Sequence, residues 1–195
     1  MAWFVPLVFT ILDQGVFRFP FNPFKLAVAV TDELRRKTFE RAVKLLAAKP
    51  RSVAELRERL LQGKGVRANE SIVETVIARL REYGYLDDER FAFSYASSKV
   101  KQRPIGRRRL QRDLKLKQVE NSVADEALEL VYAETPEEQL IDRAIEKRIR
   151  LRGRPKTRAE AKSLFDHLLR QGFGFELVSE KVRLAVQYTD DPDEC

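Results

Sequence analysis

Residues able to act as nucleophiles, general bases or metal ligands are scarce in this sequence. It contains one cysteine, Cys195, and one histidine, His167. A zinc site of the Cys/His type needs several such ligands, so the sequence excludes one. His167 lies among Leu164, Leu168 and Leu169, which favours a packing or surface role on a helix over a place in a catalytic triad. Phosphate-binding glycine loops and GxSxG nucleophile motifs are also missing from the sequence.

One acidic cluster, Asp87-Asp88-Glu89, has the residue types of a metal site. An apolar helical pattern follows it from Phe91 onward, so the cluster falls at the start of a helix. Acidic side chains there cap free backbone N–H groups and interact favourably with the helix dipole. We therefore expect helix capping, with no metal, no cofactor and no catalytic activity.

Positive charge is the dominant chemical feature of the chain, which carries 37 Lys and Arg against 30 Asp and Glu. Residues 99–117 contain nine basic residues and one acid, and residues 143–158 contain eight and one. Like charges this dense repel one another, and an anionic partner offsets the repulsion. The predicted binding patch consists of Lys99, Lys101, Arg103, Arg107, Arg108, Arg109, Arg112, Lys115, Lys117, Arg148, Arg150, Arg152, Arg154 and Lys156.

A second interpretation of the two basic blocks is a solvated surface that keeps the protein soluble. Few aromatic residues occur within the blocks to stack unpaired bases, and no cluster of Asn or Gln stands beside the arginines to read base edges. The composition therefore favours contacts with phosphates or with acidic protein surface over sequence-specific DNA recognition.

The elements that must position these residues follow a period of 54 residues. Leu56, Leu110 and Leu164 are related by this shift, and so are the leucines four residues after each of them. Apolar residues at spacings of three and four predict three helices in each unit, and no stretch shows sustained strand alternation. The predicted fold is all-α: an elongated tandem array of three three-helix repeats, each leaning on its neighbours.

The predicted boundaries divide the chain into a poorly ordered apolar extension (residues 1–34), three repeats (35–86, 87–134 and 135–188) and an acidic tail (189–195). The extension lacks the positive start of a signal peptide, and its first apolar run is too short to span a bilayer as a helix. It is interpreted as an extension or as the product of a start codon placed too early. We expect a cytoplasmic monomer without a membrane anchor.

Local signals mark the ends of individual helices. The first helix of repeat 1 is predicted over residues 38–49, and Pro50 ends it. Ser52, with Glu55 three residues later, predicts a capping box for the next helix. Thr157 is a predicted N-cap in the third repeat.

Four segments together resemble one known family. They are Ser52-Val53-Ala54-Glu55-Leu56 followed by Leu60, Gly84-Tyr85-Leu86-Asp87-Asp88 leading to Phe91, Gly106 with Arg108 and Leu110-x-x-x-Leu114, and Leu168-x-x-x-Gly172-Phe173. In this order and spacing the chain, from about residue 39 to residue 186, resembles the RecX family of RecA recombinase regulators. The Gly-Tyr-Leu-Asp-Asp segment with the downstream Gly-Arg-Arg-Arg-Leu run is the most specific part.

The resemblance implies three tandem three-helix repeats, in agreement with the 54-residue period. It also implies a role in recombination and DNA repair: a non-catalytic protein that binds RecA filaments on single-stranded DNA. Such proteins suppress strand exchange, ATP hydrolysis and the coprotease activity that triggers the SOS response. The competing hypothesis is a general basic nucleic-acid-binding module that acts independently of RecA. Residues 1–30 and the acidic tail lie outside the family pattern.

Overall fold

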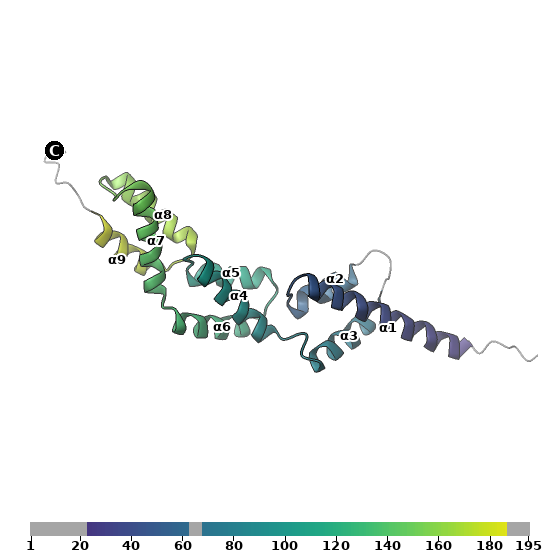
Figure 1. Ribbon diagram of the computed structural model, residues 1–195. Coiled ribbons are helices and arrows are strands. Elements are labelled where there is room, and N and C mark those ends of the chain that lie inside the picture. The colour runs from purple at the N-terminus through teal and green to yellow at the C-terminus, as the bar shows by residue number, and fades with distance from the viewer. Residues whose placement is uncertain (1–22, 63–67, 187–195) are drawn as a thin grey trace, which may run out of the picture.

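The computed structural model describes residues 23–62 and 68–186, which form nine α-helices and no strand. In chain order these are α1 (Pro23–Ala48), α2 (Val53–Leu61), α3 (Glu70–Glu82), α4 (Asp88–Gln102), α5 (Arg107–Leu116), α6 (Asn121–Glu134), α7 (Glu137–Arg152), α8 (Arg158–Gln171) and α9 (Phe175–Ala185). Three groups of three helices follow one another along an elongated molecule (Figure 1). This confirms the predicted fold, while the repeat boundaries drawn from the sequence stay predictions.

The first helix is longer than predicted. α1 begins at Pro23 rather than at Thr38, so residues 23–34, which the sequence pattern assigns to the poorly ordered extension, are helical. Leu34 packs against the core of the first repeat, and ion pairs at helical spacing between Arg36 and Glu33 line the exposed side. Such pairs stabilise a helix that has little apolar periodicity to reveal it. The rest of the extension and the acidic tail lie outside the described residues.

The acidic cluster at the start of α4 caps two helices. Asp87 accepts a hydrogen bond from the backbone N–H of Arg90 at 2.9 Å and so caps its own helix. Asp88 accepts from the backbone N–H of Val53 at 2.9 Å and so caps α2 of the preceding repeat. The predicted capping role is confirmed, and one of the two carboxylates also ties repeat 2 to repeat 1.

The capping box predicted at the start of α2 is only half formed. Ser52 accepts from the backbone N–H of Glu55 at 3.1 Å, as expected. The Glu55 carboxylate instead pairs with the Arg51 guanidinium and lies 3.7 Å from the Lys117 ammonium. Two cations outcompete a neutral backbone N–H for a carboxylate, which explains the difference. A complete capping box forms at the start of α8, at the predicted N-cap Thr157.

The periodic leucines form the cores. Leu56, Leu110 and Leu164 expose at most 2% of their surface, and the leucine four residues after each is fully buried. Repeat 1 has a core of its own, whereas repeats 2 and 3 share one continuous core that extends from α4 to α9. Burying each leucine contributes about 1.5–3 kcal/mol. The array is therefore one small unit attached to a larger, two-repeat unit.

Repeats 2 and 3 are joined where the start of α5 meets the end of α8. The N–H of Gly106 donates to the C=O of Gln171 at 3.0 Å, and that of Arg108 donates to the C=O of Gly172 at 3.1 Å. A Cβ on Gly106 would overlap the backbone of Gly172. Gly172 itself has a φ of +94°, and a Cβ there would overlap Arg109. Two glycines thus permit the close backbone approach that merges the two cores.

Repeats 1 and 2 meet through polar contacts at α2. The Ser52 hydroxyl donates to the C=O of Lys117 at the end of α5. The Gln118 side-chain amide donates to the carboxylate of Glu58 at 2.8 Å. No shared apolar core forms at this junction within the described residues.

Replacing Gly172 by alanine is expected to destabilise the protein by about 2–5 kcal/mol. The positive φ costs a non-glycine residue about 1–2 kcal/mol, and overpacking against Arg109 costs about 1–3 kcal/mol more. Urea unfolding followed by circular dichroism measures the difference. Gly84→Ala, at a φ of +69° in open space, isolates backbone strain, and Gly174→Ala, in open space with a φ of −65°, is the control. Equal losses for Gly172→Ala and Gly84→Ala would show that the close approach is unimportant.

Candidate anion-binding surface

The residues of the predicted patch lie at the end of α4, along α5 and its C-cap, and from the end of α7 into the loop before α8. Five of them are half-buried: Lys99, Arg107, Arg109, Lys117 and Arg148. The other nine are exposed. The half-buried side chains contact other parts of the protein, so the patch divides into residues that hold the fold and residues that face solvent.

Arg107 holds the fold. Its guanidinium lies 2.6 Å from the carboxylate of Glu129 on α6, and its backbone N–H donates to the Glu137 carboxylate at 2.9 Å. The side-chain hydrogen bond between the two groups raises the pKa of the Arg107 guanidinium and lowers the pKa of the Glu129 carboxyl. Burial raises the pKa of Glu137, although the N–H of Arg107 opposes that shift. Arg107 therefore joins α5 to α6 and α7, with its charge already paired.

Two arginines of repeat 2, Arg103 and Arg109, lie near the junction with repeat 3. Arg103 and Arg109 lie close enough to Tyr95 to lower the pKa of its hydroxyl, which burial and, to a smaller extent, Asp113 raise overall. The Arg109 guanidinium donates to the C=O of Arg170 at 3.3 Å. Since Arg170 lies in the last turn of α8, this contact places a basic residue of repeat 2 beside one of repeat 3.

The charge continues onto the end of α7. Burial is the first cause that lowers the pKa of the Arg148 guanidinium, and the nearby charges of Arg152 and Arg170 lower it further. Burial and the same three arginines also lower the pKa of His167 on α8. The basic strip, as we call it, consists of Arg103, Arg109, Arg148, Arg152 and Arg170.

For seven predicted residues, no side-chain hydrogen bond, ion pair or pKa effect within the described residues links them to the basic strip, although Arg154 lines a small pocket together with Arg148 and Arg152. They are Lys101, Arg108, Arg112, Lys115, Arg150, Arg154 and Lys156, and all are exposed. Arg108 and Arg112 lie four residues apart on one face of α5, as the sequence indicated. These seven stay candidates on charge and exposure alone.

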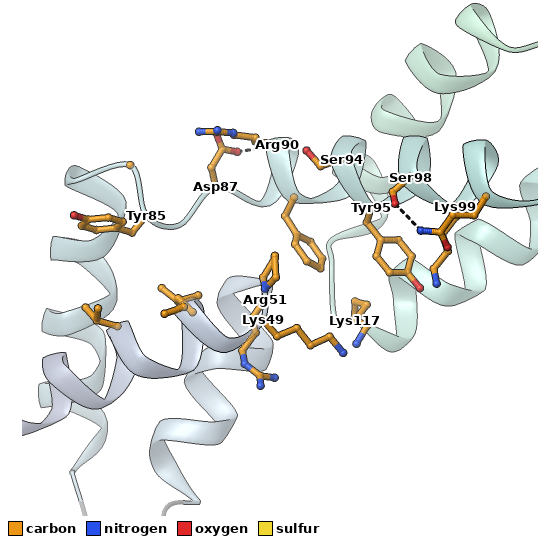
Figure 2. A pocket seen from close by; sticks show the side chains of 17 residues that line it. Lys49, Arg51, Tyr85, Asp87, Arg90, Ser94, Tyr95, Ser98, Lys99 and Lys117 are labelled. Carbon is orange, nitrogen blue, oxygen red and sulfur yellow. Dashed lines mark hydrogen bonds between the residues drawn. The ribbon is translucent and has the colours of Figure 1, made fainter.

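Lys99 and Lys117 lie in a different place, a cleft between the end of α1 and α4 (Figure 2). Lys49 lies there too, close enough to Lys117 for the positive charge of Lys117 to lower the pKa of the Lys49 ammonium. Charge density along the sequence missed Lys49 and Arg170, because each is separated from the dense blocks and joins them only through folding. Arg170 lies inside the Leu168-x-x-x-Gly172 motif, a signal that could have drawn attention to it.

The basic strip has the chemistry of an anion-binding surface. Guanidinium groups bind phosphates and carboxylates through paired hydrogen bonds, and an anion between neighbouring arginines offsets their repulsion. Across the described ranges no group of three or more His, Cys, Asp or Glu side chains could hold a metal ion. In the same part of the chain, no helix is long and apolar enough to cross a membrane.

Comparison with known proteins gives consistent matches. The sequence model of the second three-helix domain of RecX matches residues 87–128. Regulatory protein RecX of Chlorobaculum tepidum is 33% identical over 153 residues, which cover 78% of this chain and 90% of that protein. Regulatory protein RecX of Bacillus licheniformis is 32% identical over 155 residues, or 80% of this chain. The match spans only 56% of the length of the Bacillus protein.

Two solved structures share the fold. The crystal structure of RecX from Lactobacillus salivarius matches with a TM-score of 0.69 at 18% identity, over 79% of this chain and 97% of that one. Another crystal structure of a regulatory protein RecX matches with a TM-score of 0.70 at 21% identity, over 84% and 78% of the two chains. The three-helix repeats of this chain and its matches to RecX proteins together place it in a class of regulatory proteins built of three-helix units. The chain belongs to the RecX family.

His167 provides a test of the basic strip, since it is the single histidine of the chain. Its pKa in the free protein is expected below the ordinary 6.5, because burial and three arginines disfavour the charged form. An anion on Arg148 and Arg170 offsets their charge, so a saturating single-stranded oligonucleotide should raise this pKa. NMR titration of the imidazole ring measures both values. Arg148→Gln should raise the pKa of His167 without any ligand. An unchanged pKa of His167 in the oligonucleotide complex would show that the DNA does not contact the strip.

Proposed function

We propose that this chain binds RecA filaments on single-stranded DNA and inhibits recombinase, ATPase and coprotease activity, without catalysis of its own. Its membership of the RecX family supports this, since its relatives bear the name of regulatory proteins. The observation that carries the proposal is the basic strip, which crosses from repeat 2 to repeat 3 of an elongated array. The filament is the principal partner, and DNA phosphates are secondary.

The shape of the protein suits a repetitive partner. Successive repeats of an elongated array can contact successive subunits of a filament, and linked contacts bind far more tightly than each does alone. Arginines of the strip would pair with carboxylates of the recombinase or with exposed phosphates. A protein bound across several subunits opposes both filament growth and the subunit movements that accompany ATP hydrolysis. The protein is proposed to act as a cytoplasmic monomer.

The proposal predicts inhibition of the cognate recombinase's DNA-dependent ATPase well below equimolar amounts. Neutralising three exposed arginines of the strip, as Arg103→Gln/Arg152→Gln/Arg170→Gln, should raise the half-inhibitory concentration about tenfold or more, since each charged contact contributes about 1 kcal/mol or more. The control, Arg59→Gln/Arg81→Gln/Arg183→Gln, removes the same charge from exposed positions elsewhere and should inhibit like the wild type. No inhibition by the wild-type protein at an equimolar ratio would contradict the proposal.

The alternative, a nucleic-acid-binding module that acts without the recombinase, makes a different prediction. It requires tight binding to bare single-stranded DNA, with an affinity that falls steeply as salt rises. If the three strip arginines contact phosphates, the triple variant Arg103→Gln/Arg152→Gln/Arg170→Gln should reduce the slope of log affinity against log salt by about 2. Strong filament binding with weak binding to bare DNA, measured by fluorescence anisotropy, would separate the two functions in favour of the filament.

A further inference from the structure

A cleft of about 670 Å³ lies where repeat 1 meets repeat 2, between the end of α1 and α4 (Figure 2). Apolar and aromatic side chains line it from both elements, including Val43 and Leu46 of α1 and Phe91 and Tyr95 of α4. Its cations are Lys49, Arg51, Arg90, Lys99 and Lys117, against one lining acid, Asp87. The cleft therefore combines an apolar floor with a strongly positive border.

The aromatic part of the floor lies on one face of α4. Phe91 and Tyr95, one helical turn apart, are stacked with ring centroids 6.1 Å apart and an interplanar angle of 26°. One turn further, the Lys99 ammonium lies 5.4 Å from the centre of the Tyr95 ring. Tyr85, on the wall nearer repeat 1, is 64% exposed. Two aromatic rings and then a cation thus follow one another along one face of α4.

The cations of the cleft are poorly neutralised. Lys117 lies 3.7 Å from the Glu55 carboxylate, but Arg51 pairs with the same group. Lys49 is close to Lys117, and that repulsion is the first cause of its lowered pKa. No salt bridge within the described residues involves Lys49 or Lys99. An anionic ligand would relieve the repulsion among these side chains.

A ligand for this cleft needs flat aromatic surface and negative charge within one short segment. An unpaired nucleotide has both, since its base stacks on aromatic side chains and its phosphates pair with lysines. We propose that the cleft binds unpaired DNA, with a base against Phe91 and Tyr95 and the flanking phosphates on Lys49, Lys99 and Lys117. A cleft of this volume lies within the range of sites that enclose small ligands, and it holds one or two nucleotides.

The polar residues of α4 favour a nucleotide over an acidic protein helix. Ser94, Ser98 and Gln102 line the same cleft opposite the apolar residues of α1. An apolar helix face packed there would bury these groups without new hydrogen-bond partners, at a cost in free energy. The edge of a base carries donors and acceptors that can pair with them. This inference deepens the proposed function, on which it rests for DNA as the strand, and its test omits the recombinase so that the two can fail separately.

The test compares two labelled probes on the full chain by fluorescence anisotropy: an oligothymidylate of about ten nucleotides and an abasic oligomer of equal length. Both carry the same phosphates, so the difference between them reports stacking. We expect the wild type to bind oligothymidylate about fivefold or more tightly than the abasic strand. Tyr95→Leu should abolish that preference, and Tyr95→Phe should keep it. Phe175→Leu, at an exposed aromatic residue outside the cleft, is the matched control and should change nothing.

A second variant covers the case in which Tyr95→Leu does not fold. Lys49→Gln/Lys99→Gln alters side chains that make no salt bridge among the described residues, and it should weaken both probes and reduce the salt slope by about 1.4. Equal affinity of the wild type for the two probes would overturn the inference. So would a polyglutamate of equal charge that binds as tightly as oligothymidylate and depends on Lys49 and Lys99, because the cleft would then be a site for acidic protein.

Discussion

The shared core of repeats 2 and 3, and the basic strip on its surface, depend on the close approach of two backbone segments at Gly106 and Gly172. This approach lets repeats 2 and 3 share one core, and it places the Arg109 guanidinium against the end of α8. Arginines that are distant in sequence thereby become neighbours. Their repulsion is offset by the burial of the shared core, which includes Leu110 and Leu168. A positively charged surface is thus maintained by apolar packing that lies beneath it.

The fold could be predicted because its cores repeat. Leucines spaced by 54 residues are buried in every repeat, and a capping residue marks the start of α2, α4 and α8. The start of α1 was not predicted, since residues 23–30 are almost uniformly apolar and therefore show no helical period, and the ion pairs of the helix begin only at Asp32. The ion pairs of the Glu55 carboxylate were also missed: Arg51 lies four residues before it, and Lys117 reaches it from another repeat.

The sequence predicted the candidate site only as two stretches rich in lysine and arginine. The number of basic residues in a stretch of sequence does not distinguish Arg107, whose charge is paired with Glu129, from Arg103, which is exposed. It also omits Arg170 and Lys49, which join the basic blocks only in three dimensions. The blocks begin at Lys99, one turn after Tyr95, so the aromatic rings beside them escaped a search confined to the blocks. Which cations are free is a property of tertiary contacts.

Contact between the basic strip and the filament is tested most directly by site-specific photo-cross-linking. A p-benzoylphenylalanine residue would replace Arg152 in the strip or Arg183 on α9, both of which are exposed. The protein would be irradiated with the cognate recombinase assembled on single-stranded DNA. We predict recombinase adducts from position 152 and few from position 183. Equal adducts from both positions, or adducts from position 183 alone, would contradict the assignment of the strip as the binding surface.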